Sequence, residues 1–160
     1  MNYTKTENRN VTEYQLNEFQ NLINILFQCC QDRLTYQSKE FDLPDAELRC
    51  LMFFKDEKYL TSKSISIKMN VGKSRITKII AGLLKKDMIK RIKDPEDSRV
   101  SLISLTSSGK EKLDEIKQFQ DNLHRVVLSQ VNDQERKKLL TNLDLLKACM
   151  ETGKEFMTGN

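Results

Sequence analysis

The sequence predicts a mainly α-helical fold with one small β-hairpin, in which a compact central segment is flanked by long helices towards both ends of the chain. Apolar residues recur at steps of three and four along residues 12–38 and 107–150, the spacing of amphipathic helices. Two short β-like runs, residues 89–93 and 100–105, flank a turn. Only 5 Gly and 2 Pro occur in 160 residues, so few positions break a helix. These observations indicate one folded domain over residues 12–150.

The composition favours a soluble globular protein over a membrane protein. Apolar residues make up 38% of the chain and charged residues 31%. The longest unbroken apolar run, Cys50–Phe54, is far shorter than the roughly 18 residues that a membrane-spanning helix needs. Residues 1–10 are polar and lack the apolar core of a secretory signal. We therefore expect a cytoplasmic protein with no membrane partner.

The residue types that most often build enzyme and metal sites are sparse. The four cysteines lack the paired spacing of zinc sites, and their apolar helical surroundings predict reduced, buried thiols. His124 is the single histidine, so neither a histidine-rich metal centre nor a catalytic triad is expected. The sequence shows no glycine-rich phosphate loop and no nucleophile motif, which argues against an enzyme, a metal site or a cofactor. The cysteines are Cys29, Cys30, Cys50 and Cys149.

Positive charge is concentrated in the middle of the chain. Residues 61–106 contain 11 Lys and Arg against 4 acidic residues, a net charge of +7. The rest of the chain carries a net charge of −3, although the whole protein is at +4. Such an asymmetry is expected when one segment faces a polyanion and its flanks do not.

Two helices are predicted before the basic segment. The apolar period over residues 12–38 indicates one long helix. Pro44 and Asp45 then open a second helix, because Pro is favoured at an early helical position and an acid stabilises the positive end of the helix dipole. This second helix should continue to about Lys55.

Residues 61–86 predict two short helices joined by a tight turn. Thr61 is a suitable N-cap for a first helix that buries Ile65 and Met69. Asn70-Val71-Gly72 forms the turn, because Asn and Gly tolerate left-handed or extended backbone. A second helix from Gly72 buries an apolar stripe, and two helices so joined form the helix-turn-helix that places its second helix in a DNA major groove. The stripe consists of Ile76, either Ile79 or Ile80, Leu83 and Leu84.

The polar face at the start of the second helix carries the candidate DNA-binding residues. Arg75 is the expected base reader, because its guanidinium can bond O6 and N7 of guanine together. Lys73 and Lys78 are expected at phosphates, as are three residues at the start of the preceding helix. For each lysine the alternative is a solvated charged face. The recognition-helix candidates are Lys73, Ser74, Arg75, Thr77 and Lys78, and the further phosphate candidates are Thr61, Ser62 and Lys63.

Residues 89–105 predict a β-hairpin directly after these helices, which we call the wing. The segment Asp94-Pro95-Glu96-Asp97-Ser98 has the composition of a turn. Lys93 and Arg99 lie beside acidic residues at the tip, so the hairpin alone does not argue for DNA. The wing and the helices before it predict a winged helix-turn-helix lobe over residues 45–106.

The last third of the chain predicts two further helices, within residues 107–150. Thr106 can cap the first, and Asn132 with Glu135 has the spacing of a capping box for the second. Together with the first long helix they expose more apolar surface than one chain hides, which predicts a helical dimerisation lobe and a homodimer. The ends expected to be flexible are residues 1–10 and 152–160.

Two segments carry a resemblance to a known family. Asp94-Pro95-Glu96-Asp97-Ser98-Arg99, followed by Leu105-Thr106 and then Gly109, is similar to the wing signature of the MarR-type winged-helix transcription regulators. The segment from Leu60 to Thr77 resembles the helix-turn-helix of that family, and the resemblance covers roughly residues 12–150. It departs from the family pattern at two positions, where Asn70 replaces a common Gly and Gly72 replaces a common Ser cap. Gly at a cap costs only a few tenths of a kcal/mol.

The resemblance implies roles for residues of the wing and the first helix. Arg99 would enter a minor groove, whose narrow A·T-rich stretches attract Arg, and Asp97 would hold its guanidinium. Lys93 is a further DNA-binding candidate in the wing. Such regulators often bind small aromatic or anionic effectors between the dimer helices and the DNA-binding lobe, and some sense peroxides through a first-helix cysteine. Cys29 and Cys30 are the redox candidates, although their place in mid-helix favours a packing role.

The sequence as a whole predicts a regulator that binds double-stranded DNA as a homodimer. We expect a repressor on a pseudo-palindromic operator, with half-sites about one helical turn or roughly 34 Å apart, relieved by a small effector. One alternative is a thiol-switched regulator of the same fold. Another is a winged-helix protein-interaction module that does not bind DNA.

Overall fold

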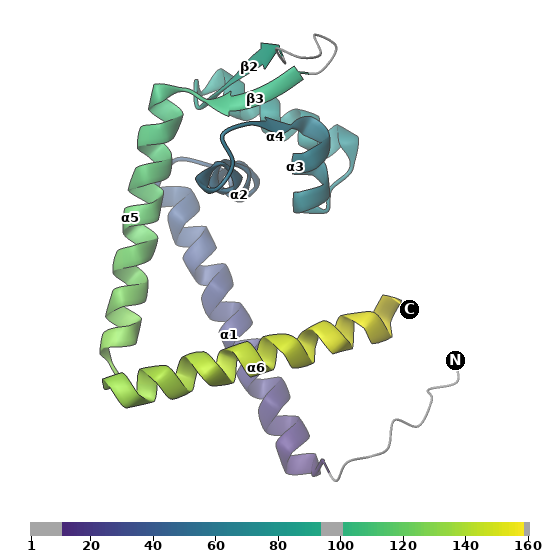
Figure 1. Cartoon of the computed structure of the whole chain (residues 1–160), viewed down its shortest axis with the longest axis vertical. Helices are drawn as coiled ribbons and strands as arrows, with labels where there is room; N and C mark the ends of the chain where they lie inside the picture. Colours follow the sequence, from purple (N-terminus) through teal and green to yellow (C-terminus); the bar gives the residue numbers. More distant parts are fainter. Residues whose placement is uncertain (1–10, 94–100, 159–160) are drawn as a thin grey trace. The chain divides into compact units, whose positions relative to one another are not determined.

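The computed structural model describes residues 11–93 and 101–158 (Figure 1). It divides into two compact units, one ending at Asp114 and the other beginning at Glu115. The predicted wing tip, with Asp97 and Arg99, and the predicted flexible residues 1–10 lie outside the described residues. The elements are α1 (Glu13–Glu40), α2 (Asp45–Met52), a 3₁₀ turn η1 (Phe53–Lys55), β1 (Leu60–Thr61), α3 (Ser62–Met69), α4 (Lys73–Lys85), β2 (Ile89–Lys93), β3 (Ser101–Leu105), α5 (Ser107–Ser129) and α6 (Asp133–Thr158).

A three-stranded antiparallel sheet in the order β1-β3-β2 forms the base of the wing (Figure 1). The predicted hairpin is confirmed, with Ile89 opposite Leu105 and Lys93 opposite Ser101. The third strand, β1, was not predicted. Two residues are too few to show an alternating pattern, and β1 exists only because Leu60 pairs with Ile103 of β3.

Helices α3 and α4 pack against the sheet, α2 packs against α3 and α4, and together they enclose the core of the first unit. The predicted apolar stripe of α4 is confirmed in outline, although both Ile79 and Ile80 are buried and Leu84 is only partly buried. We refer to residues 45–105 as the winged lobe. Its buried apolar side chains are Leu48, Cys50, Leu51, Phe54, Leu60, Ile65, Met69, Ile76, Ile79, Ile80, Leu83, Ile89 and Ile103.

Local capping signals set the beginnings of the helices, as predicted. The Thr12 hydroxyl accepts from the backbone N–H of Gln15 and starts α1 at Glu13. Pro44 occupies the N-cap of α2 instead of its first turn. At the second unit, Asn132 and Glu135 form the predicted capping box, with side-chain to backbone distances of 3.0 and 3.1 Å. These contacts are all within four residues, which is why a sequence pattern can find them.

Helix α6 extends further along the chain than the predicted helix, which ended near residue 150. Helix α6 continues to Thr158, whereas we expected residues 152–160 to be flexible. No Pro occurs in this segment, and Gly153 alone does not end a helix, since an interior Gly costs only about 1 kcal/mol.

The long helices expose much of their apolar surface within the single chain. Phe19 and Leu26 of α1 are 47% and 52% exposed, and Leu143 of α6 is 46% exposed. The prediction that all cysteines are buried is wrong for Cys29, Cys30 and Cys149, because these lie on helical surfaces that nothing in the described chain covers. Among the described residues, no helix is long and apolar enough to cross a membrane.

Cys50 is the one cysteine that is buried as predicted. Burial, followed by the nearby Glu47 carboxylate, raises the pKa of the Cys50 thiol to about 12. The thiol therefore stays protonated at neutral pH and acts as a small apolar side chain in the core of the winged lobe.

Candidate nucleic-acid interface

Helices α3 and α4 form the predicted helix-turn-helix, and a left-handed residue makes the turn between them. Asn70 has φ of 52° and ends α3, a conformation that Asn adopts more readily than most residues. The Ser66 hydroxyl donates to the backbone oxygen of Val71 over 2.6 Å and ties the turn back to α3. The departure from the family pattern at Asn70 is therefore accommodated by the backbone.

Helix α4 separates its apolar and polar residues onto different faces. Ile76, Ile80 and Leu83 are at most 2% exposed and fix the helix to the core. The opposite face carries all five predicted recognition residues. These exposed residues are Lys73, Ser74, Arg75, Thr77 and Lys78.

The first turn of α4 combines the positive end of the helix dipole with cationic side chains. Gly72 is the N-cap and provides no side-chain hydrogen bond, and the first turn contains no acidic residue. The Thr77 hydroxyl donates to the backbone oxygen of Lys73 over 2.9 Å, so its proton is used within the helix. Backbone N–H groups at a helix N-terminus and nearby Lys and Arg suit binding of a phosphate.

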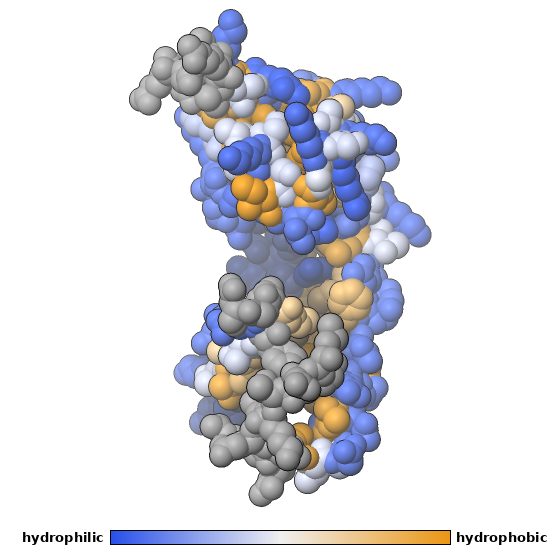
Figure 2. Space-filling model, turned by 90° about the vertical axis from the view of Figure 1, so that its right-hand side faces the viewer, coloured by the Kyte–Doolittle hydropathy of each residue, from blue (hydrophilic) through white to orange (hydrophobic). Residues whose placement is uncertain are grey.

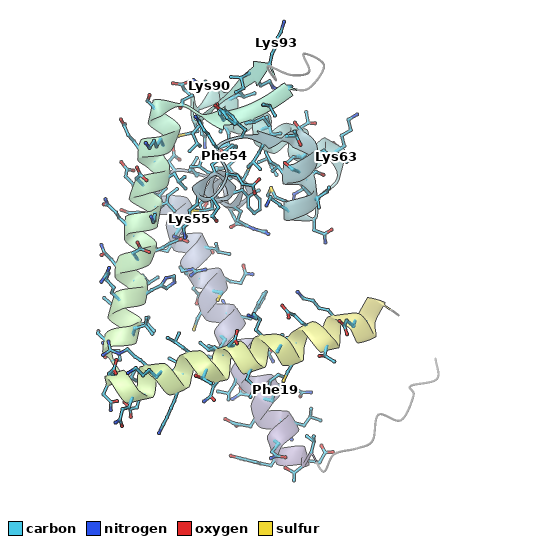
Figure 3. All side chains as sticks on the ribbon, in the orientation of Figure 1. Phe19, Phe54, Lys55, Lys63, Lys90 and Lys93 are labelled. Atoms are coloured by element: carbon cyan, nitrogen blue, oxygen red, sulfur yellow. The ribbon has the colours of Figure 1, made fainter. Side chains whose placement is uncertain are left out.

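The residues at the start of α3 differ in how available their side chains are for a contact with DNA. The Thr61 hydroxyl accepts from the backbone N–H of Ser64 over 3.0 Å as part of a capping box. Thr61 and Ser62 are half-buried, whereas Lys63 is exposed (Figure 3). The Thr61 hydroxyl therefore caps α3, a role that its prediction as a phosphate contact did not include. Lys63 has no such capping role among the described residues.

The described part of the wing adds further cations. Lys93 lies at the end of β2 and is exposed, as are Lys90 and Arg91 on the same strand (Figure 3). Figure 2 shows the side of the winged lobe on which α3 lies in Figure 1, and its surface is mainly hydrophilic (blue). The structure therefore places cationic side chains on α3, α4 and β2 at the surface of one lobe.

A partly buried contact beside α4 was not predicted from the sequence. The Glu47 carboxylate of α2 lies where a side chain at Gly82 of α4 would be, 2.0 Å from an added Cβ. Lys86, just after α4, makes an ion pair with Glu47 over 3.1 Å and donates to the backbone oxygen of Asp42 over 2.9 Å. The side chain of Glu47 is only 12% exposed. A glycine inside a helical pattern is the signal that could have indicated this close approach.

Comparisons with known proteins agree with this arrangement. Residues 43–101 match the model of the MarR family. The matched segment runs from just before α2 to the wing. Over this segment the chain is similar to the MarR family. It is 28% identical over 131 residues to the uncharacterised HTH-type transcriptional regulator YdgJ of Bacillus subtilis (strain 168), covering 79% of this chain and 71% of YdgJ. YdgJ is named as a transcriptional regulator, and the similarity of this chain to the MarR family lies in the segment that contains the helix-turn-helix.

Solved structures show the same fold at lower sequence identity. YusO of Bacillus subtilis has a TM-score of 0.70 at 24% identity, over 86% of this chain and 99% of YusO. MepR, a transcription regulator of the Staphylococcus aureus multidrug efflux pump MepA, has a TM-score of 0.72 at 18% identity, over 82% of this chain and 98% of MepR. A MepR–DNA complex has a TM-score of 0.65 at 19% identity and covers 82% of this chain.

Proposed function

We propose that the protein is a homodimeric repressor that binds a pseudo-palindromic DNA operator through the exposed face of α4. The observation that carries this proposal is the separation of the two faces of α4, which leaves Lys73, Arg75 and Lys78 exposed on a helix anchored by buried Ile76 and Leu83. The structural similarity to MepR, which has been solved with DNA, supports it. A small effector would relieve repression by favouring a dimer whose spacing does not match DNA.

An α-helix, about 10–12 Å in diameter with its side chains, fits the major groove, which is about 12 Å wide. The 13 residues of α4 span about 20 Å at 1.5 Å per residue. Arg75 lies in the first turn, where recognition helices present their base-reading side chains. We assign Arg75 to a guanine base, Lys73, Lys78 and Lys63 to phosphates, and Arg99 with Asp97 to the minor groove.

The apolar surface of the long helices supports the proposed dimer. In α6, Leu139, Leu143 and Met150 are 40%, 46% and 49% exposed and recur at a helical spacing of four and seven. Burial of apolar surface is worth roughly 25 cal/mol per Å², so these side chains favour contact with a second copy over contact with water. A two-fold dimer would present two α4 helices to two half-sites.

The proposal is tested by DNA-binding anisotropy. We expect the protein to bind the duplex upstream of its own gene more tightly than a scrambled duplex, with affinity that falls steeply between about 50 and 200 mM salt. Arg75→Ala should lose about 10- to 100-fold in affinity for the native duplex and relax the choice at one base pair per half-site. Lys85→Ala, at the other end of the same helix, is the matched control and should leave the sequence preference unchanged.

Each outcome separates the proposal from its alternatives. If Arg75→Ala keeps the full sequence preference, Arg75 is not the base reader. A dimer that binds no duplex even at low salt would instead support a protein-interaction module of the same fold. A duplex-bound protein with no self-association would contradict the dimer.

A thiol-switched regulator is the second candidate, and the exposure of Cys29 and Cys30 in the single chain favours it. Exposed thiols are accessible to peroxide, whereas buried Cys50 is not. This candidate predicts that peroxide weakens DNA binding of the wild type and leaves a Cys29→Ser/Cys30→Ser variant unaffected. Indifference of the wild type to peroxide would dismiss it.

A further inference from the structure

The C-terminal end of α4 carries a contact that belongs neither to its apolar stripe nor to its polar face. Lys86 follows α4 directly and is its C-cap. The Lys86 ammonium makes an ion pair with the Glu47 carboxylate of α2 over 3.1 Å and donates to the backbone oxygen of Asp42 over 2.9 Å. Asp42 lies in the turn after α1, so the side chain of Lys86 links α4 to both α1 and α2 within the first unit. We call Asp42, Glu47 and Lys86 the clasp.

A glycine of α4 makes room for the clasp. A Cβ at Gly82 would lie 2.0 Å from Oε1 and 2.8 Å from Cδ of Glu47, so a larger residue would displace that carboxylate. An interior Gly destabilises a helix relative to Ala. The close approach of Glu47 is the use of Gly82 that the described residues show.

The clasp is shielded from water on the side of α2. The Glu47 side chain is 12% exposed, and its Oε2 atom is out of contact with solvent and accepts no hydrogen bond from a described residue. A carboxylate oxygen removed from water needs a compensating charge, which the Lys86 ammonium supplies. By contrast, both side chains of the Lys68–Glu57 pair in the same lobe are 40% exposed, so water screens that pair.

The clasp restrains a motion of α4 that apolar packing leaves open. Ile76, Ile80 and Leu83 determine which face of α4 meets the core. Apolar contact is non-directional, so it sets this face more firmly than it sets the tilt of the helix. Contacts between charged groups and hydrogen-bond partners are short and directional, and those of Lys86 reach two other elements. A contact of this kind defines where one end of α4 lies.

A small tilt at the clasp becomes a large displacement at the other end of α4. Arg75 lies 11 residues before Lys86, about 16 Å at 1.5 Å per residue. A tilt of about 10° around Lys86 would move Arg75 by roughly 3 Å, which is about the length of a hydrogen bond. Base reading is therefore sensitive to the position of the far end of the helix.

We propose that Glu47 and Lys86 are positioning residues for sequence-specific DNA binding, because they hold α4 so that Arg75 meets its base. The proposal rests on the proposed function and adds residues that do not touch DNA. Loss of the clasp should reduce the discrimination between native and scrambled duplexes. Most of the non-specific affinity should remain, because phosphate contacts carry no sequence information.

Gly82→Ala separates positioning from stability and from charge. This substitution changes no charge, pushes the Glu47 carboxylate away from α4 and favours the helical state. We expect the ratio of native-duplex to scrambled-duplex affinity to fall about 10-fold in anisotropy, at a temperature where each variant is fully folded. A role in stability alone would leave this ratio at the wild-type value. Gly153→Ala is the matched control, since its added Cβ meets nothing within 4 Å.

Glu47→Gln and Lys86→Met test the ion pair itself. Each should lower the affinity ratio about 10-fold, and the double variant should lose no more than either single variant, because both remove the same contact. Lys86→Arg keeps a cationic donor and should retain most of the ratio. Lys85→Met and Glu57→Gln are the charge-matched controls outside the clasp and should leave the ratio unchanged.

An Arg75→Ala background tests whether the clasp acts through Arg75. In that background Glu47→Gln should lower the affinity ratio by less than about 2-fold, because the side chain that the clasp positions has been removed. A second loss of about 10-fold would overturn the proposal, since the clasp would then act on another part of the protein.

Hydrogen exchange of the free protein gives a readout that does not depend on DNA. Glu47→Gln and Gly82→Ala should each speed exchange at the C-terminal end of α4 and at residues 41–43 by at least about 3-fold. Unchanged exchange in both variants would overturn the clasp whatever the DNA result.

The two readouts together distinguish failure of the clasp from failure of the proposed function. Faster exchange with an unchanged affinity ratio would overturn the positioning role. A wild type without preference for the native duplex would reject the proposed function and the positioning role with it. Faster exchange in the variants would then still support the clasp as the contact that holds α4.

Discussion

The winged lobe and the long helices place their apolar residues in opposite ways. In the winged lobe, Leu51, Ile65 and Leu83 are 0% exposed, because three helices and a sheet enclose them. In α1 and α6, Phe19 and Leu143 are 47% and 46% exposed, although they follow an equally regular helical period. Figure 2 shows apolar (orange) side chains at the surface of the molecule.

This difference shows that helical periodicity in a sequence predicts an apolar helix face but does not predict which segment covers that face. The winged lobe buries the apolar faces of its own helices and sheet against one another, within about sixty residues of sequence. A long helix offers a face along its whole length, and only a second surface of similar length can cover it. We expect the lobe to carry most of the stability of the single chain, and the long helices to depend on self-association.

The largest effect is expected for a truncation in the core of the lobe. Leu83→Ala should lower the free energy of unfolding by about 2–5 kcal/mol, because it removes buried methyl groups and leaves a cavity. Urea denaturation measures this. The neighbouring Leu84→Ala, at a partly buried position, is the control and should cost less. Equal losses for the two variants would show that the lobe is not packed as described.

The next prediction tests whether a second copy of the chain covers the apolar face of α6. Leu143→Lys should weaken self-association by about 100-fold, or about 2.7 kcal/mol, because a charge would be buried in the proposed dimer contact. Sedimentation velocity over a concentration series measures the shift. Leu145→Lys is the matched control, since Leu145 is 64% exposed and lies off the Leu139–Leu143–Met150 stripe. If both variants stay dimeric, this face of α6 is not the interface.

A smaller effect is expected where α5 approaches the lobe. A Cβ at Gly109 would lie 1.7 Å from the backbone oxygen of Met88, so Gly109→Ala forces the backbone to move and should cost about 1–3 kcal/mol. Gly153→Ala meets nothing within 4 Å and should be neutral or stabilise α6 by up to about 1 kcal/mol. Thermal unfolding of the two variants would compare them. A neutral Gly109→Ala would contradict the close contact.

The smallest predicted effect is the pH dependence of the stability that Cys50 contributes. The pKa of Cys50 is raised by burial from 9.0 to about 12, so between these values the folded protein holds a proton that the unfolded chain has lost. Stability from this group is complete below pH 9 and falls as pH rises above it, by about 1 kcal/mol at pH 10. The difference in unfolding free energy between wild type and Cys50→Ala should therefore shrink from pH 8 to pH 10. A constant difference would show that Cys50 is not buried as a neutral thiol.

The parts of the fold that were predictable depend on neighbours in the sequence. Thr61 and Asn132 cap their helices through residues three positions later, and Asn70 makes its turn through its own backbone preference. The exposed face of α4 follows from the period of its buried residues. Strand β1 and the contact of Glu47 with Gly82 were not predicted, because each joins segments more than thirty residues apart. Gly82 in the helical pattern signals a close approach but does not identify its partner.

The sequence alone determined the helical pattern, the helix-turn-helix with its five exposed polar residues, and the basic character of the middle segment, since each follows from local spacing and charge. The tertiary structure decided what surrounds each residue. It exposed Cys29 and buried Cys50 although both lie in similar helical patterns, and it brought Glu47 and Lys86 into one ion pair. The physical reason is that periodicity fixes which side chains share a face, whereas burial depends on which other segment the folded chain places against that face.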